Sequence, residues 1–292
     1  TVRRKPEKRL IFVVIMKKFL LLTVLAFGIS SAVYAQNLLV VDSLIAHMSV
    51  REKVAQLFVI SLSSNPSPRT KARQDSLIKS GVGSIILMRG YASEFMERVN
   101  ELQGYAKLPL LVSIDGEWGA AMRFKEYLED PRQYELGHLE NAERLLYRMG
   151  INVGKELKDL NVMVNLAPCA DVSVDGVSCG IRNDSRLFSS NPEKVARYSA
   201  AYARGMRDAG IYVCAKHFPG CGNGVDSHYD LPISHITREA LDSIDLLPYK
   251  RLFEEDIEFV MMHHVSVPCI DDSGLPLSIS HKGVTGLLKE EL

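Results

Sequence analysis

The sequence lacks a long hydrophobic run, a net charge and a cysteine-rich segment. Of its 292 residues 47% are hydrophobic and 24% are charged, with 5 cysteines and one tryptophan. These proportions exclude a disordered chain, a collagen-like fibre and a small scaffold held by disulfides. The longest N-terminal apolar run, 19–29, is too short to cross about 30 Å of hydrocarbon, which takes roughly 20 helical residues. We therefore expect a globular protein without an integral membrane segment.

The absence of net charge hides an uneven distribution. Seven of the 35 basic residues but only one of the 35 acids lie within 1–35. The remainder, 36–292, holds 28 basic and 34 acidic residues, a balance of −6. A mildly acidic body has no electrostatic attraction for phosphate backbones or anionic lipid, so we expect no nucleic-acid partner.

The segment 1–35 has the pattern of an export signal. Met-Lys-Lys at 16–18 precedes the apolar run 19–29, and small residues then lead to Val-Tyr-Ala at 33–35. This order predicts a signal peptide cleaved before Gln36. Because the chain opens with threonine, we interpret the residues before Met16 as an upstream extension. The mature domain then covers 36–292 and is periplasmic or secreted.

The five cysteines form no recognisable metal motif. None has CxxC spacing, and an odd number leaves at least one thiol unpaired. Cys169 and Cys179 are close enough in sequence for a loop disulfide in an oxidising compartment, but burial as small apolar residues is our preferred interpretation. We therefore predict no metal site.

Short apolar runs alternate with longer helical patterns along the mature chain. Apolar strands with little alternation are typical of a parallel α/β sheet covered on both faces. Successive strand–helix units without a repeat or linker favour a (β/α)8 TIM-type barrel over two domains. Such a barrel needs eight strands and only six are found, so we interpret the chain as an incomplete barrel. We expect strands over 57–62, 82–88, 110–114, 163–167, 212–216 and 259–265, and helices over about 70–80, 92–106, 138–160, 192–209, 237–255 and 281–291.

Polar residues follow several of these strands, and barrel chemistry lies at the carboxyl ends of strands. Asp115 and Arg123 follow the third strand, Arg186 belongs to the loop after the fourth, and Lys216 and His217 end the fifth. Such groups donate to and accept from vicinal hydroxyls, which suits a hydroxyl-rich substrate. Any one of them alone is equally consistent with a cap or a loop salt bridge. Together they predict one substrate site.

The glycine-rich segment 220–228 carries the sharpest local hypothesis, because it ends in Asp226-Ser227-His228. The Asp226 carboxylate can accept a proton from one imidazole nitrogen, fix the tautomer of His228 and raise its pKa. The other nitrogen can then protonate a leaving group. A surface Asp-x-His pair without a role is the alternative. The glycine spacing fits neither a dinucleotide nor a Walker phosphate loop.

These motifs resemble, in order, those of glycoside hydrolase family 3 and its β-N-acetylglucosaminidase branch. The most specific match is Lys-His-Phe-Pro-Gly at 216–220 followed by Asp-Ser-His at 226–228, and 115–123, 186–189 and 260–268 match further family elements. The resemblance runs from Met48 to the chain end. It implies a (β/α)8 barrel, a carbohydrate substrate of cell-wall or chitin type, and no metal or organic cofactor.

The resemblance also implies residue roles in the retaining hydrolysis of terminal β-linked N-acetylglucosamine or another N-acetylhexosamine. His228 is the expected general acid/base and Asp226 its dyad partner, where most retaining glycosidases use a carboxylic acid. The nucleophile is an aspartate expected beyond Leu292, so we expect this chain alone to be inactive. Sugar binding is implied for Asp115, Arg123, Arg186, Lys216 and His217.

The chain departs from the family pattern around the dyad. Cys221 and Asn223 stand where histidine and aspartate are usual, and the loop is one residue shorter, which leaves dyad placement open. Trp118 replaces a family glycine, and we expect it to pack beneath its loop rather than to stack on a sugar.

Four other functions remain open. Two belong to the same family: a β-glucosidase, which the Asp-Ser-His loop disfavours, and a phosphorylase, because a neutral histidine repels phosphate less than a carboxylate. A third is a non-catalytic sugar-binding fragment. The fourth is a metal-dependent hydrolase, disfavoured because the first strand lacks His-x-His and Lys216 would repel a cation. Its ligands would be Asp115, His217, His228 and His263.

Overall fold

The computed structural model describes residues 39–173, 184–220, 227 and 229–292. The chain divides into two compact units, one ending at Ala55 and one from Gln56 to Leu292. The first unit holds helical residues 39–47 and most of α2 (Val50–Gln56), which begins at a Ser-x-x-Glu capping box formed by Ser49 and Glu52. The predicted signal segment 1–35 lies outside the described residues. No helix among the described residues combines the length and apolar character needed to cross a membrane.

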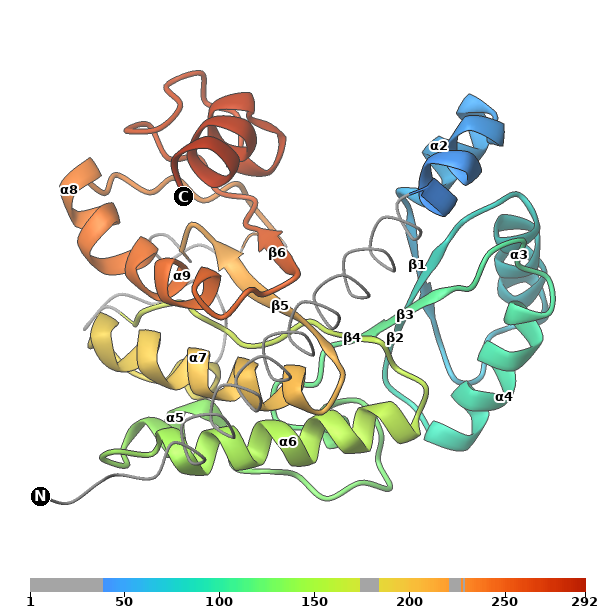
Figure 1. The fold of residues 1–292 in the computed structure, drawn as a ribbon, viewed down its shortest axis with the longest axis horizontal. Coiled ribbons are helices and arrows are strands. Elements are labelled where there is room, and N and C mark those ends of the chain that lie inside the picture. Colours follow the sequence, from blue (N-terminus) through green and yellow to red (C-terminus); the bar gives the residue numbers. More distant parts are fainter. Residues whose placement is uncertain (1–38, 174–183, 221–226, 228) are drawn as a thin grey trace, which may run out of the picture. The chain divides into compact units, whose positions relative to one another are not determined.

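The second unit is built on a six-stranded parallel sheet in which each strand pairs with the next along the chain (Figure 1). This order confirms the predicted fold, an incomplete (β/α)8-type barrel with six strand–helix units. All six strands fall within or close to their predicted ranges. They are β1 (Val59–Leu62), β2 (Ser84–Leu87), β3 (Leu111–Ile114), β4 (Val164–Asn165), β5 (Tyr212–Phe218) and β6 (Phe259–Met262).

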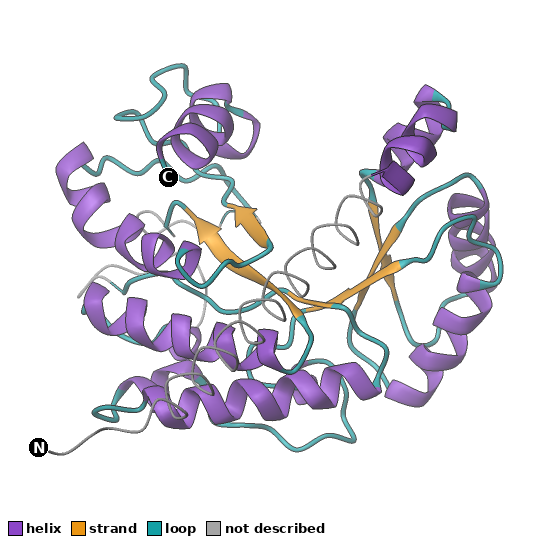
Figure 2. Ribbon diagram, in the orientation of Figure 1, coloured by secondary structure: helices purple, strands orange, loops and turns teal. Residues whose placement is uncertain are grey.

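Helices alternate with these strands along the chain (Figure 2). Asn191 caps α7 (Pro192–Asp208): its side-chain oxygen accepts a hydrogen bond from the Lys194 amide at 3.1 Å, and Pro192 occupies the first turn. The short α5 (Gln133–Gly137) was not predicted. The longer helices match their predicted ranges and are α3 (Pro68–Lys79), α4 (Ala92–Gln103), α6 (Glu143–Asp159) and α7 (Pro192–Asp208).

The predicted helix 237–255 is divided into three parts. They are α8 (Arg238–Ala240), a π-helical turn η3 (Leu241–Asp245) and α9 (Leu246–Phe253). Pro248 gives the physical reason, because it has no amide to donate to the carbonyl four residues earlier, within η3. A second π-helical segment, η5 (Lys282–Glu291), ends the described chain.

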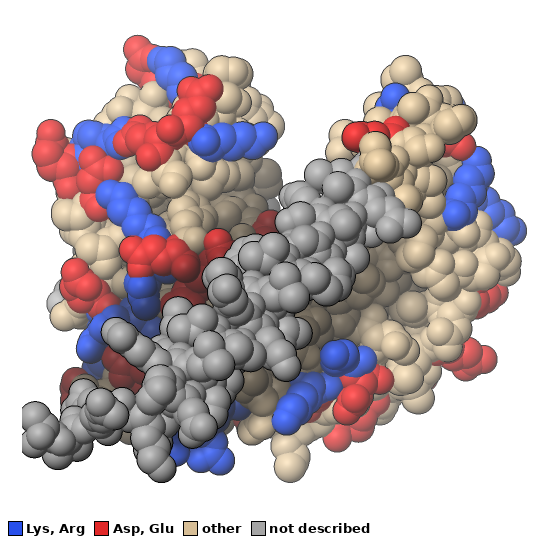
Figure 3. All heavy atoms as spheres, viewed as in Figure 1, with Lys and Arg blue, Asp and Glu red and all other residues tan. Residues whose placement is uncertain are grey.

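Helices α6 and α7 pack directly against each other (Figure 1). Their contact is made by glycines: a Cβ atom on Gly205 would lie 2.1 Å from the Tyr147 carbonyl oxygen, and one on Gly150 2.4 Å from that of Tyr202. Acidic and basic side chains are interspersed on the visible surface of this unit (Figure 3). Arg207 of α7, for example, pairs with Glu258 at 2.7 Å.

Candidate active site

Strand β5 carries a buried lysine into a cluster of charges. Lys216 is 1% exposed, and its Nζ lies 2.7 Å from Asp115 Oδ1 and 2.7 Å from Glu117 Oε1. Both acids follow β3, the neighbour but one of β5 in the sheet. The second Asp115 oxygen accepts from Arg123 Nη2, directly after the short helix η1 (Ala120–Met122). One cation therefore bridges two carboxylates that the chain places next to each other.

Glu117 connects this cluster to the loop after β4. Glu117 is 0% exposed, and its carboxylate forms a bidentate ion pair with Arg186. Arg186 Nε donates to Oε2 at 2.9 Å, and Nη2 donates to Oε1 at 2.6 Å. This two-bond geometry is among the strongest that arginine forms. Glu117 was not among the predicted site residues. The signal available in the sequence was its place two residues after Asp115, beyond a strand end.

Opposite effects set the protonation of these groups. Burial raises the pKa of Glu117, but the charge of Lys216 and the hydrogen bonds from Arg186 outweigh it and hold this pKa well below its usual value. Burial also raises the pKa of Asp115, and Lys216 and then Arg123 bring it below the ordinary range. Burial lowers the pKa of Lys216, yet Glu117 and Asp115 raise it overall. All three groups are therefore ionised at neutral pH.

A buried asparagine holds the turn that carries both acids. Gly116 lies between them, and its amide donates to Asn165 Oδ1 at 2.9 Å while Asn165 Nδ2 donates to the Gly116 carbonyl at 3.0 Å. A Cβ atom on Gly116 would approach Asn165 Oδ1 to 3.2 Å. Strand β4 thus fixes the direction in which the two carboxylates leave β3.

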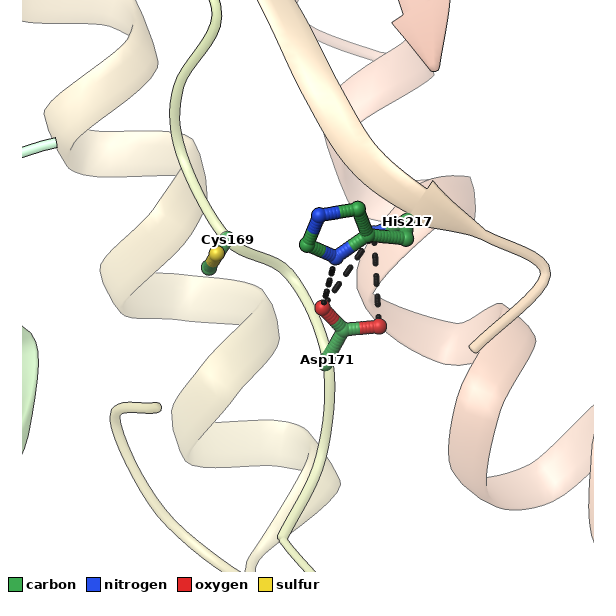
Figure 4. Close-up of side chains that lie close together, drawn as sticks. All are labelled: Cys169, Asp171 and His217. Atoms are coloured by element: carbon green, nitrogen blue, oxygen red, sulfur yellow. Dashed lines mark hydrogen bonds and ion pairs between the residues drawn. The ribbon is translucent and has the colours of Figure 1, made fainter. Parts of the chain in front are cut away.

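His217 is oriented by a second buried acid, Asp171 (Figure 4). Its Nδ1 lies 2.8 Å from Asp171 Oδ2, and its backbone amide donates to the same carboxylate at 3.2 and 3.3 Å. In the neutral ring, an Nδ1–H that donates to Asp171 leaves Nε2 as an acceptor. Asp171 follows β4 and was not among the predicted site residues.

Four of the five residues predicted to bind substrate, Asp115, Arg123, Arg186 and Lys216, belong to one ion-pair network with Glu117. The fifth, His217, follows Lys216 in sequence and pairs with Asp171 instead. The dyad residues Asp226 and His228 lie outside the described residues, as do Cys221 and Asn223.

Three further expectations can also be compared with the structure. Cys169 is free and fully buried, which agrees with the apolar interpretation rather than a disulfide. Trp118 is buried, as expected for packing under the loop, and the guanidinium carbon of Arg132 lies 4.5 Å from the centroid of the Trp118 ring. Asp115, one of the ligands considered for a metal-dependent hydrolase, is engaged by Lys216 and Arg123.

The chain is similar to several known proteins. A curated beta-hexosaminidase from Alkalilimnicola ehrlichii is 33% identical over 229 residues, 72% of this chain and 62% of that protein. Beta-hexosaminidase LpqI from Mycobacterium tuberculosis is 30% identical over 253 residues, 84% of this chain and 61% of that protein. The solved structure of a glycoside hydrolase family 3 beta-N-acetylglucosaminidase from Paenibacillus sp. str. FPU-7 aligns with a TM-score of 0.72 and 30% identity, over 82% of this chain and 47% of that one.

The chain thus spans about six tenths of the length of these curated relatives. Residues 49–292 match the model of the glycosyl hydrolase family 3 N terminal domain, which includes the whole charged cluster. Since this match covers most of the sequence, the chain belongs to glycosyl hydrolase family 3.

Proposed function

We propose that the full-length protein is a β-N-acetylhexosaminidase that removes terminal β-linked N-acetylglucosamine. The observation that carries this proposal is the cluster around Lys216, in which Asp115, Glu117, Arg123 and Arg186 present fixed donors and acceptors at the carboxyl ends of β3 and β5. A sugar ring offers adjacent hydroxyls that can accept from the cations and donate to the carboxylates. Curated relatives named beta-hexosaminidase support the choice of an amino sugar.

The proposed reaction retains the anomeric configuration in two steps. A carboxylate supplied from beyond Leu292 attacks the anomeric carbon, the bond to the aglycone oxygen breaks, and the His228 imidazolium gives that oxygen its proton. Water then forms a bond to the anomeric carbon, neutral His228 takes the proton of the water, and the carboxylate leaves. Asp226 stabilises the imidazolium in this scheme. We further propose that segment 16–35 exports the protein, which would place it among cell-wall or chitin-type fragments in the periplasm or outside the cell.

Turnover by a full-length form tests the substrate class. We expect nitrophenyl β-N-acetylglucosaminide to be cleaved much faster than the corresponding glucoside, at a rate that phosphate does not change. Preference for the glucoside would favour a β-glucosidase. A glycosyl phosphate product that forms only with phosphate would favour a phosphorylase.

The variant His228→Ala tests the acid/base role. Loss of a positioned general acid should slow cleavage of unactivated aglycones by about 10²–10⁴-fold and affect nitrophenyl leaving groups less. His235→Ala, at an exposed histidine a few residues later, is the matched control and should leave the rates unchanged. An equal loss for both kinds of aglycone would contradict general acid catalysis by His228.

A further inference from the structure

A thiol, a carboxylate and an imidazole converge beside the charged cluster. Cys169 Sγ, a carboxylate oxygen of Asp171 and a ring nitrogen of His217 all lie within 4.8 Å of one another (Figure 4). Cys169 and Asp171 are buried, and His217 is partly exposed. No sequence motif indicates this group, because Cys169 and His217 are far apart in the chain.

The backbone holds these donors in place. The Ala170 amide donates to the Lys216 carbonyl at 2.7 Å, and the Lys216 amide donates to the Pro168 carbonyl at 3.1 Å. These two bonds join the segment that carries Cys169 and Asp171 directly to the end of β5, which carries His217. The three donors are therefore neighbours as a result of the fold, before any ligand binds.

We propose that Cys169, Asp171 and His217 form a binding site for a soft or borderline divalent cation such as Zn²⁺ or Cd²⁺. Thiolate and imidazole favour these ions, and three protein ligands leave a fourth position for water. Tetrahedral bonds of about 2.0–2.3 Å place ligand atoms roughly 3.3–3.8 Å apart, so a pair of donors at the 4.8 Å limit would need to close by about 1 Å. Binding forms a metal–sulfur bond and releases the thiol proton to solvent.

The positive charge of Lys216 does not oppose this site strongly. Its ammonium is bound at 2.7 Å by both Asp115 and Glu117, so its charge is compensated within the cluster. Arg186 is likewise held by Glu117. With Arg123 included, the cluster has three cations and two carboxylates, a net charge of +1, which the carboxylate of Asp171 and a thiolate at Cys169 would offset at the site.

Cadmium titration of the reduced protein tests the site without any assay of activity. A Cys269→Ser background removes an exposed thiol. We expect a thiolate-to-cadmium absorption band at one ion per chain, which Cys169→Ala abolishes and the matched buried-cysteine variant Cys214→Ala retains. Asp171→Asn should raise the dissociation constant for Cd²⁺ at least tenfold. Thermal melting establishes that each variant is folded.

A band that survives in Cys169→Ala, or a dissociation constant that Asp171→Asn leaves unchanged, would overturn the site. A metal on His217 also competes for an imidazole that we propose to contact sugar, a step that rests on the proposed function. We therefore expect Cd²⁺ to inhibit the full-length form and a chelator to restore it. Cadmium binding without inhibition would overturn this competition, whereas metal-free protein without hexosaminidase activity would instead contradict the proposed function.

Discussion

Lys216 is the residue on which the charged cluster depends, because it is the cation shared by Asp115 and Glu117. Taking a lysine out of water is costly, and the two buried carboxylates offset that cost only while all three charges are present. The same residue is also proposed to bind sugar. Burial of Lys216 therefore couples the stability of the carboxyl ends of the strands to the geometry of the site.

Replacing Lys216 by methionine should strongly destabilise the fold. The variant leaves two like charges without their shared cation, which typically costs about 3–5 kcal/mol of unfolding free energy. Lys282→Met is the matched control, because Lys282 also lies between two aspartates, Asp271 and Asp272, but is 59% exposed. It should cost less than about 1 kcal/mol. Denaturant unfolding measures both, and similar losses would show that burial of Lys216 adds nothing.

Asp245 should make the protein less stable as the pH rises. Burial and then the charge of Asp171 raise its pKa from 3.8 to about 7. The folded state therefore retains a proton that the unfolded chain releases, and stability is lost between about pH 4 and pH 7, by up to about 4 kcal/mol at ~1.4 kcal/mol per pKa unit. Asp245→Asn should remove this loss and be more stable than the wild type at pH 8.

The control for Asp245 is Asp242→Asn in the same turn of helix. Arg238 lowers the pKa of Asp242, so this substitution should reduce stability at neutral pH instead of increasing it. Unfolding free energies of both variants, measured from pH 4 to pH 8, show whether each substitution raises or lowers stability. A pH profile of Asp245→Asn parallel to the wild type would contradict the raised pKa.

The α6–α7 contact shows that a helical sequence pattern predicts a helix but not how that helix packs. Periodicity predicted both helices, but not that Gly150 and Gly205 bring their backbones together. The π-helical turn before Pro248 was missed for a related reason, since its hydrogen bonds depend on how the helix packs. Strands were predicted more accurately because their apolar runs are bounded by polar or turn residues.

Gly205→Ala should destabilise the second unit. The new methyl group would lie 2.1 Å from the Tyr147 carbonyl oxygen, so α6 and α7 must separate, at a cost of about 1–3 kcal/mol. Gly286→Ala in η5 meets no atom within 4 Å and is the matched control. It should be neutral or stabilise by up to about 1 kcal/mol. Thermal unfolding compares the two, and equal effects would mean that the helix contact tolerates a side chain.

At the scale of the molecule, the charged cluster joins parts of the chain that are distant in sequence. Asp115 and Lys216 are 101 residues apart, and Arg186 contacts Glu117 across 69. The barrel rule predicted that these strand ends would meet. It could not predict which groups pair, because Glu117 and Asp171 contribute through burial and geometry rather than through a sequence motif.

These long-range ion pairs should make the whole fold sensitive to acid. The pKa values of Glu117 and Asp115 are lowered in the folded state, so their contribution is present above the ordinary carboxyl pKa and is lost as the pH falls. Below about pH 4.5 the unfolded chain binds the protons first, which lowers the unfolding free energy. Glu117→Gln should therefore be less stable at pH 7 and show a shallower acid loss, whereas the exposed control Glu94→Gln should follow the wild type. Should Glu117→Gln keep the wild-type slope between pH 5 and pH 3, the acid sensitivity would have to arise from surface pairs, and the cluster would not be what joins β3, β5 and the Arg186 loop.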